Sequence, residues 1–170
     1  MKYREEIMEL MDEINYGWVD KDGNSHTKLQ DMIDLYRLQT PEELMKNKVG
    51  LCCDQVELER KLLEEKGIKT HAYFIVYVDN KKFPCHTFLS FEDNNKFYYF
   101  EHAWNEHKGI KEFNSEKELL NEVKKYFIGI ELKDGYIDEN IFVFEYSKPN
   151  KKLNTLEFYD WCQKGIKKDF

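Results

Sequence analysis

Apolar residues recur at helical spacing in the first third of the chain and predict a series of short helices. Residues 7–14 place isoleucine, leucine and methionine on one face, and a second apolar stripe covers residues 28–38. Each stripe predicts a helix. Thr40 followed by Glu43 has the spacing of a capping box, which marks the start of a third helix that we expect to end near Asn47.

A longer helix and three strands are predicted in the middle of the chain. Apolar positions in residues 52–66 form a helical stripe, and Gly67 is a suitable helix end. Residues 70–78, 83–91 and 96–103 are rich in β-branched and aromatic residues and are separated by short polar connectors. Short connectors favour antiparallel hairpins, so these strands are expected to be neighbours in one sheet.

The C-terminal part adds two helices and one strand to this pattern. Residues 115–127 and 154–164 are predicted helices, with Ser115 at the first helix start, and residues 141–146 read as a buried strand. The whole chain is predicted to be α+β, with helices packed on a small, mainly antiparallel sheet. A length of 170 residues suits a single domain over residues 1–170.

Composition narrows the classes of partner and compartment. The charged fraction is 35% and the formal net charge is −7. Nucleic acids and anionic membranes reward a basic surface, so neither is an expected partner, and a basic or neutral partner fits better. No apolar run approaches the ~18 residues of a membrane helix, and the N-terminus lacks the apolar segment of a signal peptide. We therefore expect a cytoplasmic protein whose four cysteines are reduced.

Candidate chemistry lies in three separate segments that carry a thiol, an imidazole and a carboxylate in that order. Cys52 begins the predicted helix 52–66, His86 falls in the second predicted strand, and Glu101 falls in the third. The fold must bring such residues together if they act as a nucleophile, a base and an orienting acid. The order is the pattern of a cysteine-based acyl-transfer site.

The same segments resemble the transglutaminase-like superfamily. Gly50, Cys52 and Asp54 match its G-x-C-x-D motif, and Glu101 and Trp104 stand at its D-x-x-W motif, with glutamate in place of aspartate. The match is concentrated in a motif-bearing core of about residues 48–104. The resemblance implies a transglutaminase-like core in which a cysteine at a helix N-terminus packs on a sheet that carries the histidine and the acid.

The resemblance also implies roles: Cys52 as nucleophile, His86 as base and acid, and Glu101 as the group that orients the imidazole. A thiol attacks a carbonyl as thiolate, and an ordinary cysteine is mostly protonated near neutral pH. The partial positive charge of a helix N-terminus and a nearby imidazolium both lower a thiol pKa. Backbone N–H groups of that first turn also suit the oxygen of a tetrahedral intermediate. The extra methylene of glutamate leaves two readings open: the strands adjust, or the third member is weaker.

Several alternatives stay open at this level. Cys53 lies about 100° around the helix from Cys52, so only one thiol can face the imidazole, and without the family the two have even odds. Both could instead be buried apolar side chains. Zinc ligation by Cys52, Cys53, Cys85 and His86 is disfavoured because neighbouring side chains diverge from a helix or a strand. We expect no metal and no cofactor.

Secondary candidates surround this set. Gln39 is a possible oxyanion donor or a solvent-facing amide, and Trp104 is a possible pocket wall or core residue. Asp54 is expected to act as a helix N-terminal charge. His71 and His102 are rival imidazoles, and His102 would take the third position if the glutamate does not.

The expected reaction is acyl transfer or hydrolysis at the amide bond of a peptide or protein. Cys52 would form a thioester, and water or an amine would release the acyl group. The alternative is a catalytically silent domain of the same fold that binds a peptide or protein, because fold alone does not define function.

Overall fold

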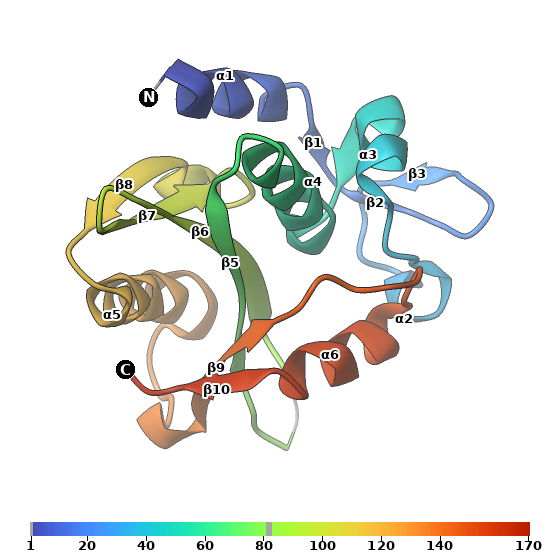
Figure 1. Ribbon diagram of the computed structural model, residues 1–170. Helices are drawn as coiled ribbons and strands as arrows, with labels where there is room; N and C mark the ends of the chain where they lie inside the picture. The colour runs from blue at the N-terminus through green and yellow to red at the C-terminus, as the bar shows by residue number, and fades with distance from the viewer. Residues whose placement is uncertain (1, 81–82) are drawn as a thin grey trace.

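One six-stranded antiparallel sheet forms the centre of the molecule (Figure 1). The computed structural model describes residues 2–80 and 83–170. The strand order is β10-β9-β5-β6-β7-β8, and each neighbouring pair is antiparallel. The strands are β5 (Lys69–Tyr77), β6 (Cys85–Asp93), β7 (Lys96–Glu101), β8 (Gly109–Phe113), β9 (Ile141–Tyr146) and β10 (Ile166–Lys168). The predicted α+β class and mainly antiparallel sheet are therefore confirmed.

The helices cover both faces of the sheet, α5 on one side and α4 with α1 and α6 on the other (Figure 1). They are α1 (Lys2–Met11), α2 (Met32–Leu35), α3 (Pro41–Asn47), α4 (Cys52–Glu64), α5 (Glu116–Phe127) and α6 (Thr155–Gln163). Single 3-10 turns occur at Asn105–His107 and Asp138–Asn140, and a π-helical turn, Ile128–Leu132, follows α5. Within the described residues, no helix is long and apolar enough to cross a membrane.

Alternation along β5 explains why both sheet faces need a cover. Tyr73 and Ile75 pack in the cluster under α5, whereas Ala72, Phe74 and Val76 pack in the cluster under α4. All five side chains are almost fully buried. The central strand is thus apolar on both faces, and burial of both faces fixes its register.

Two small strand pairs attach the N-terminal segment to the start of α4. β1 (Asn15–Tyr16) pairs in parallel with β4 (Val49–Gly50), and β2 (Trp18–Val19) pairs with β3 (Ser25–His26) in a hairpin. Because β4 ends two residues before Cys52, the β1–β4 pair anchors the chain that leads into this helix. None of these two-residue strands was predicted.

Helix starts follow the local capping signals. The Thr40 hydroxyl accepts a hydrogen bond from Glu43 N at 3.1 Å, and the Ser115 hydroxyl accepts one from Glu118 N at 3.1 Å. The Glu43 carboxylate binds Lys152 Nζ at 2.7 Å. One first-turn N–H of each helix is bound by the cap hydroxyl as the sequence predicts, which confirms where α3 and α5 begin, whereas the Glu118 carboxylate accepts from Asn114 N rather than from Ser115 N.

The helix predicted over residues 28–38 is wrong for most of its length. Only α2, four residues long, is helical there, and Asp31 at its start adopts a left-handed backbone with φ 61°. That conformation interrupts a helix. Leu29 and Ile33 are 65% and 56% exposed, so the apolar stripe is not the buried face of a helix.

Candidate active site

Cys52 occupies the first position of α4, and close packing of its flanking residues fixes it there. Leu51 before it is extended and buried, and Asp54 Oδ2 accepts a hydrogen bond from Leu51 N at 2.9 Å. Gly50 lies so close that an added Cβ would be 2.5 Å from Leu44 Cδ1 and 3.0 Å from Asp54 Cβ. The glycine and the aspartate of the G-x-C-x-D motif therefore act together: one allows the close approach and the other caps the helix.

Asp54 is a structural carboxylate that links α4 to the segment before α3. Its Oδ1 accepts hydrogen bonds from Tyr36 Oη at 2.9 Å and from Gln39 N at 2.8 Å. Burial raises the pKa of Asp54 to about 7, although these hydrogen bonds and that from Leu51 oppose the rise. Asp54 lies at the helix N-terminus, as the sequence predicts, and its oxygens are engaged by protein donors.

The two adjacent thiols have different surroundings. Cys53 is 5% exposed and its Sγ lies 2.9 Å from Tyr36 Oη, within the apolar core under α4. Burial raises its pKa well above the ordinary value. Both thiols line one cavity that opens at the surface, but Cys52 is partly exposed whereas Cys53 is buried. The structure therefore separates the two thiols in the way that favours Cys52 for chemistry.

His86 and Glu101 form a buried pair beside this thiol. His86 Nε2 lies 2.8 Å from Glu101 Oε2, and the side chains are 3% and 2% exposed. Tyr99 Oη donates to Glu101 Oε2 at 2.6 Å, and Trp104 N donates to Glu101 Oε1 at 2.8 Å. The longer acid thus reaches the imidazole with both oxygens held, and the His86 nitrogen left for Cys52 is Nδ1.

Trp104 covers the imidazole. Its ring stacks on His86 with centroids 3.6 Å apart and planes 10° from parallel. Simple alternation predicts Trp104 on the face opposite Glu101, and this is wrong because β7 ends at Glu101 and the chain turns toward the Asn105–His107 turn. The stack fixes the ring plane of His86 and excludes water from one of its faces.

The electrostatics of the group favour a thiolate and an imidazolium. A hydrogen bond with Cys53 is the largest cause that lowers the pKa of Cys52, followed by a hydrogen bond with His86 and the charge of His86, and the pKa falls well below the ordinary value. Burial lowers the pKa of His86, but the Glu101 charge and hydrogen bonds to Cys52 and Glu101 raise it to about 10. Both shifts therefore favour the charged thiolate–imidazolium pair over two neutral groups.

Other sequence candidates lie in different contacts. Gln39 donates from Nε2 to Val49 O at 2.8 Å and does not line the cavity of Cys52, so its amide is not free for an oxyanion. His102 Nδ1 lies 2.7 Å from Gln55 Oε1 rather than in the third position of the set. His71 faces Glu145 at 2.9 Å, about 13 Å along β5 from Ile75, the residue opposite His86.

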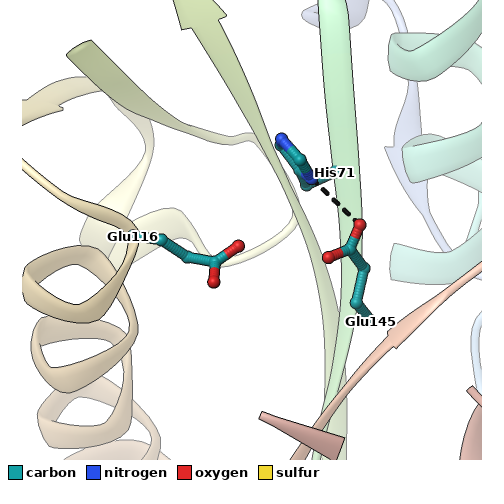
Figure 2. Close-up of side chains that lie close together, drawn as sticks. All are labelled: His71, Glu116 and Glu145. Carbon is teal, nitrogen blue, oxygen red and sulfur yellow. Dashed lines mark hydrogen bonds and ion pairs between the residues drawn. The ribbon is translucent and has the colours of Figure 1, made fainter. Parts of the chain in front are cut away.

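His71, Glu116 and Glu145 form the one group in residues 2–80 and 83–170 whose potential metal-ligand atoms lie within 4.8 Å of one another (Figure 2). Lys168 Nζ lies 3.2 Å from Glu116 and 3.1 Å from Glu145, so an ammonium already neutralises the carboxylates. A hydrogen bond with Glu145 raises the pKa of His71, which favours a charged ring, whereas a metal needs the neutral ring. Ion pairing accounts for this cluster.

Two residues of the site were missed at the level of sequence. Tyr99 precedes Glu101 by two positions on the same strand face, so alternation alone could have suggested a contact. Glu131, in the π-helical turn, lines the cavity of Cys52 and follows an apolar stretch that carries no motif. No local pattern could have placed it there.

Comparison with known proteins agrees with the fold and with the motif positions. A family model described as a transglutaminase-like domain matches residues 1–126, which is most of the chain. The protein belongs to this transglutaminase-like family. No curated protein matches the chain. The matched range contains Cys52, His86 and Glu101, whereas β9 and α6 lie beyond it.

Proposed function

We propose that this protein is a cysteine-dependent acyl-transfer enzyme that acts on an amide of a peptide or protein. The observation that supports the proposal is the contact series from Cys52 through His86 to Glu101, with the thiol exposed to a cavity. Membership of the transglutaminase-like family supports the same class of chemistry. Residues 1–170 are proposed to act as one domain, because β9 completes the sheet beside β5.

In the first step, the Cys52 thiolate attacks the amide carbonyl carbon. The new S–C bond forms while the carbonyl π electrons move to the oxygen, which becomes an oxyanion. Free backbone N–H groups in the first turn of α4 are suited to stabilise this charge, since helix N-termini leave such donors unpaired. The attack thus uses the same helix end that favours the thiolate.

In the second step, the C–N bond breaks and His86 gives its proton to the departing nitrogen. An amine leaves and a thioester remains on Cys52. Glu101 keeps the imidazole in place and stabilises its charged form before the transfer. Neutral His86 can then accept a proton from water or from a second amine as either attacks the thioester, which restores free Cys52.

The proposal is tested by the rate of iodoacetamide labelling at each cysteine as a function of pH, read by peptide mass spectrometry. Cys52 should label fast well below pH 8.5, where an ordinary thiol is mostly protonated. Cys53 and Cys85 should label slowly, because burial raises both pKa values, that of Cys85 to about 12. They are internal controls in the same sample.

Substitution of His86 shows whether Cys52 labels fast because of its imidazole partner or only because its thiol is exposed to solvent. In His86→Ala, Cys52 should lose its fast labelling below pH 8, whereas His26→Ala, which changes a hairpin histidine stacked on Trp18, should leave the profile unchanged. Circular dichroism checks that each variant is folded. Equal labelling of Cys52 in the parent and in His86→Ala would refute the thiolate–imidazolium pair.

A turnover assay distinguishes the enzyme from a silent binding domain. A panel of peptide amides is incubated with the parent and with Cys52→Ala, and both released amine and affinity are measured. Turnover that disappears in Cys52→Ala while affinity stays supports the enzyme. Equal affinity in both proteins with no turnover in the parent would favour the binding domain.

A further inference from the structure

The cavity beside Cys52, called here the Cys52 cavity, has a volume of about 260 Å³ and is shaped largely by apolar side chains. Phe74 of β5 and Phe158 and Tyr159 of α6 form part of its wall, and Tyr16, Leu29 and Phe83 also line it. Helix α6 lies outside the family match, which ends at residue 126. Part of the shape beside the nucleophile therefore comes from a segment beyond the matched range.

Exposed apolar side chains gather at this cavity. Tyr16, Leu29 and Phe83 are 54%, 65% and 54% exposed, and all three line it. Single exposed apolar side chains are ordinary, but several around one cavity mark a binding surface. A group that enters the cavity and covers them would be apolar.

One charged side chain, that of Glu131, lies within this apolar lining. Among the described lining residues, Glu131 is the only one with a charged side chain near neutral pH other than Cys52 itself. Within residues 2–80 and 83–170 its carboxylate forms no ion pair or hydrogen bond. Burial raises the pKa of Glu131, against the lowering effect of the His86 charge, so the carboxylate lies within electrostatic range of the reacting pair.

The aromatic rings act in the same direction as this carboxylate. Tyr16, Phe83 and Tyr159 line the same cavity, and aromatic faces attract cations and not anions. A cationic group in the cavity would meet both the rings and Glu131, whereas an anionic group would meet neither favourably. The net charge of −7 adds a weak attraction of the same sign.

We infer that the Cys52 cavity selects an acyl donor whose acyl group has an apolar body and carries a positive charge, with the charge bound beside Glu131. This inference rests on the proposed acyl transfer at Cys52. It defines a substrate class: amides or esters of acyl groups that are apolar and cationic. Leu29 and Phe83 at the apolar lining and Glu131 are the specificity-determining residues.

The test uses p-nitrophenyl esters of matched shape. The 6-(trimethylammonio)hexanoyl ester is cationic, the 7,7-dimethyloctanoyl ester has the same shape without charge, and the acetyl ester lacks the apolar body. In each case the Cys52 S–C bond forms, the ester C–O bond breaks and p-nitrophenolate leaves. Stopped-flow release of p-nitrophenolate gives the acylation rate, and each rate is divided by that with free cysteine to remove intrinsic reactivity.

The neutral long ester should acylate Cys52 at least about tenfold faster than the acetyl ester, since even small changes of apolar contact shift rates by this amount. The cationic ester should acylate Cys52 about tenfold faster than its neutral analogue. Added salt should reduce this preference, because the ion pair between Glu131 and the trimethylammonium group is partly exposed to solvent. Equal rates for the three esters, with Cys52 acylated, would overturn the inference and leave the proposed function intact.

Variants assign the two preferences to residues. Glu131→Gln should bring the ratio of the cationic to the neutral rate close to one, whatever its effect on the neutral rate itself, whereas Glu139→Gln, which changes an exposed carboxylate that does not line the cavity, should leave this ratio unchanged. Phe83→Ser should slow both long esters, and Ile166→Ser, which alters an exposed apolar residue elsewhere, should not. A cation preference that survives in Glu131→Gln would contradict the assignment.

Two further arms separate other sources of a charge effect. The inference is wrong if the trimethylammonium ester acylates Cys52 no faster than its neutral analogue while added primary amines speed only the release of the acyl group. In that case the cationic group belongs to the amine that accepts the acyl group and not to the acyl donor. If no ester acylates Cys52 in the folded protein, the proposed function fails. Calorimetry of Cys52→Ala with the matching primary amides then still tests the cavity, and equal affinity for cationic and neutral amides would overturn the inference.

Discussion

Replacement of Gly50 by alanine should disturb the start of α4 by a predictable amount. The added Cβ would lie 2.5 Å from Leu44 Cδ1 and 3.0 Å from Asp54 Cβ, whereas ordinary contact begins at 3.4 Å. The leucine methyl must therefore move by about 0.9 Å and the aspartate Cβ by about 0.4 Å to relieve the clash. Leu44 is fully buried and Asp54 is held by three hydrogen bonds, so neither moves freely.

The expected loss combines two opposing effects. Overpacking of this kind typically costs about 1–3 kcal/mol, while the change from glycine to alanine stabilises by about 0.4–1 kcal/mol through the unfolded chain. We expect Gly50→Ala to lower the free energy of unfolding by about 1–2 kcal/mol. Because the displaced turn carries Cys52, the acylation rate should fall by about tenfold, as a shift approaching 1 Å can reduce catalysis a hundredfold.

Urea unfolding followed by tryptophan fluorescence measures the stability, and p-nitrophenyl acetate measures acylation of Cys52. Gly129→Ala is the matched control, because an added Cβ there meets nothing within 4 Å and should be neutral or slightly stabilising. In the background Leu44→Ala, which removes the nearest atom, Gly50→Ala should be less harmful by at least about 0.5 kcal/mol. If Gly50→Ala behaves like Gly129→Ala in both assays, the close-approach explanation of the motif is wrong.

Two further substitutions test the buried polar contacts. Arg60→Met leaves the buried Glu57 without its partner at 3.1 Å and should lower the free energy of unfolding by about 3–5 kcal/mol. Burial already raises the pKa of Glu57, so its carboxyl group opposes folding when it is ionised and stops doing so once it is protonated at low pH. The loss of unfolding free energy in Arg60→Met, measured with urea, should therefore be smaller near about pH 4 than near about pH 8. An equal loss at both pH values would contradict this reasoning. Tyr99→Phe removes the 2.6 Å hydrogen bond to Glu101 and should slow acylation about tenfold while stability changes by less than about 1.5 kcal/mol, and an unchanged rate would show that Tyr99 does not position the acid.

Local signals predicted much of the fold because they depend on few residues. The starts of α3 and α5 rest on Thr40 and Ser115, whose hydroxyls bind N–H groups three positions away. β9 was predicted with its observed limits from a single apolar run, Ile141–Tyr146. Capping and apolar runs involve neighbours in sequence, so tertiary context seldom overrides them at such clear sites.

Elements that depend on contacts outside their own segment were missed or predicted wrongly. β8 (Gly109–Phe113) and β10 (Ile166–Lys168) are edge strands with exposed or half-buried residues, so neither shows strong alternation. α2 is cut short by the left-handed backbone of Asp31. β8 and β10 are decided by pairing with β7 and β9, that is, by contacts outside the element itself, which periodicity does not report.

The candidate site also has one part that local patterns predicted and one part that they did not. The order Cys52, His86, Glu101 was readable because helix start and strand positions follow from local patterns, and the structure brings these three side chains into one contact series. Their catalytic roles stay a prediction. The position of Glu131 depends on the turn after α5, and the stacking of Trp104 on His86 depends on the turn after β7. No sequence pattern at these positions predicts either turn.

The position of β9 in the sheet has a consequence for folding of the chain as it is synthesised. Ala72 in β5 lies opposite Tyr146 in β9, so this pair closes a loop of more than seventy residues. Until β9 is made, one edge of the apolar strand β5 has no neighbour, and an open apolar edge is a template for aggregation. Pairings so distant in sequence also form slowly. The nascent chain thus carries Cys52 and an unprotected strand edge together until residues 141–146 have been made.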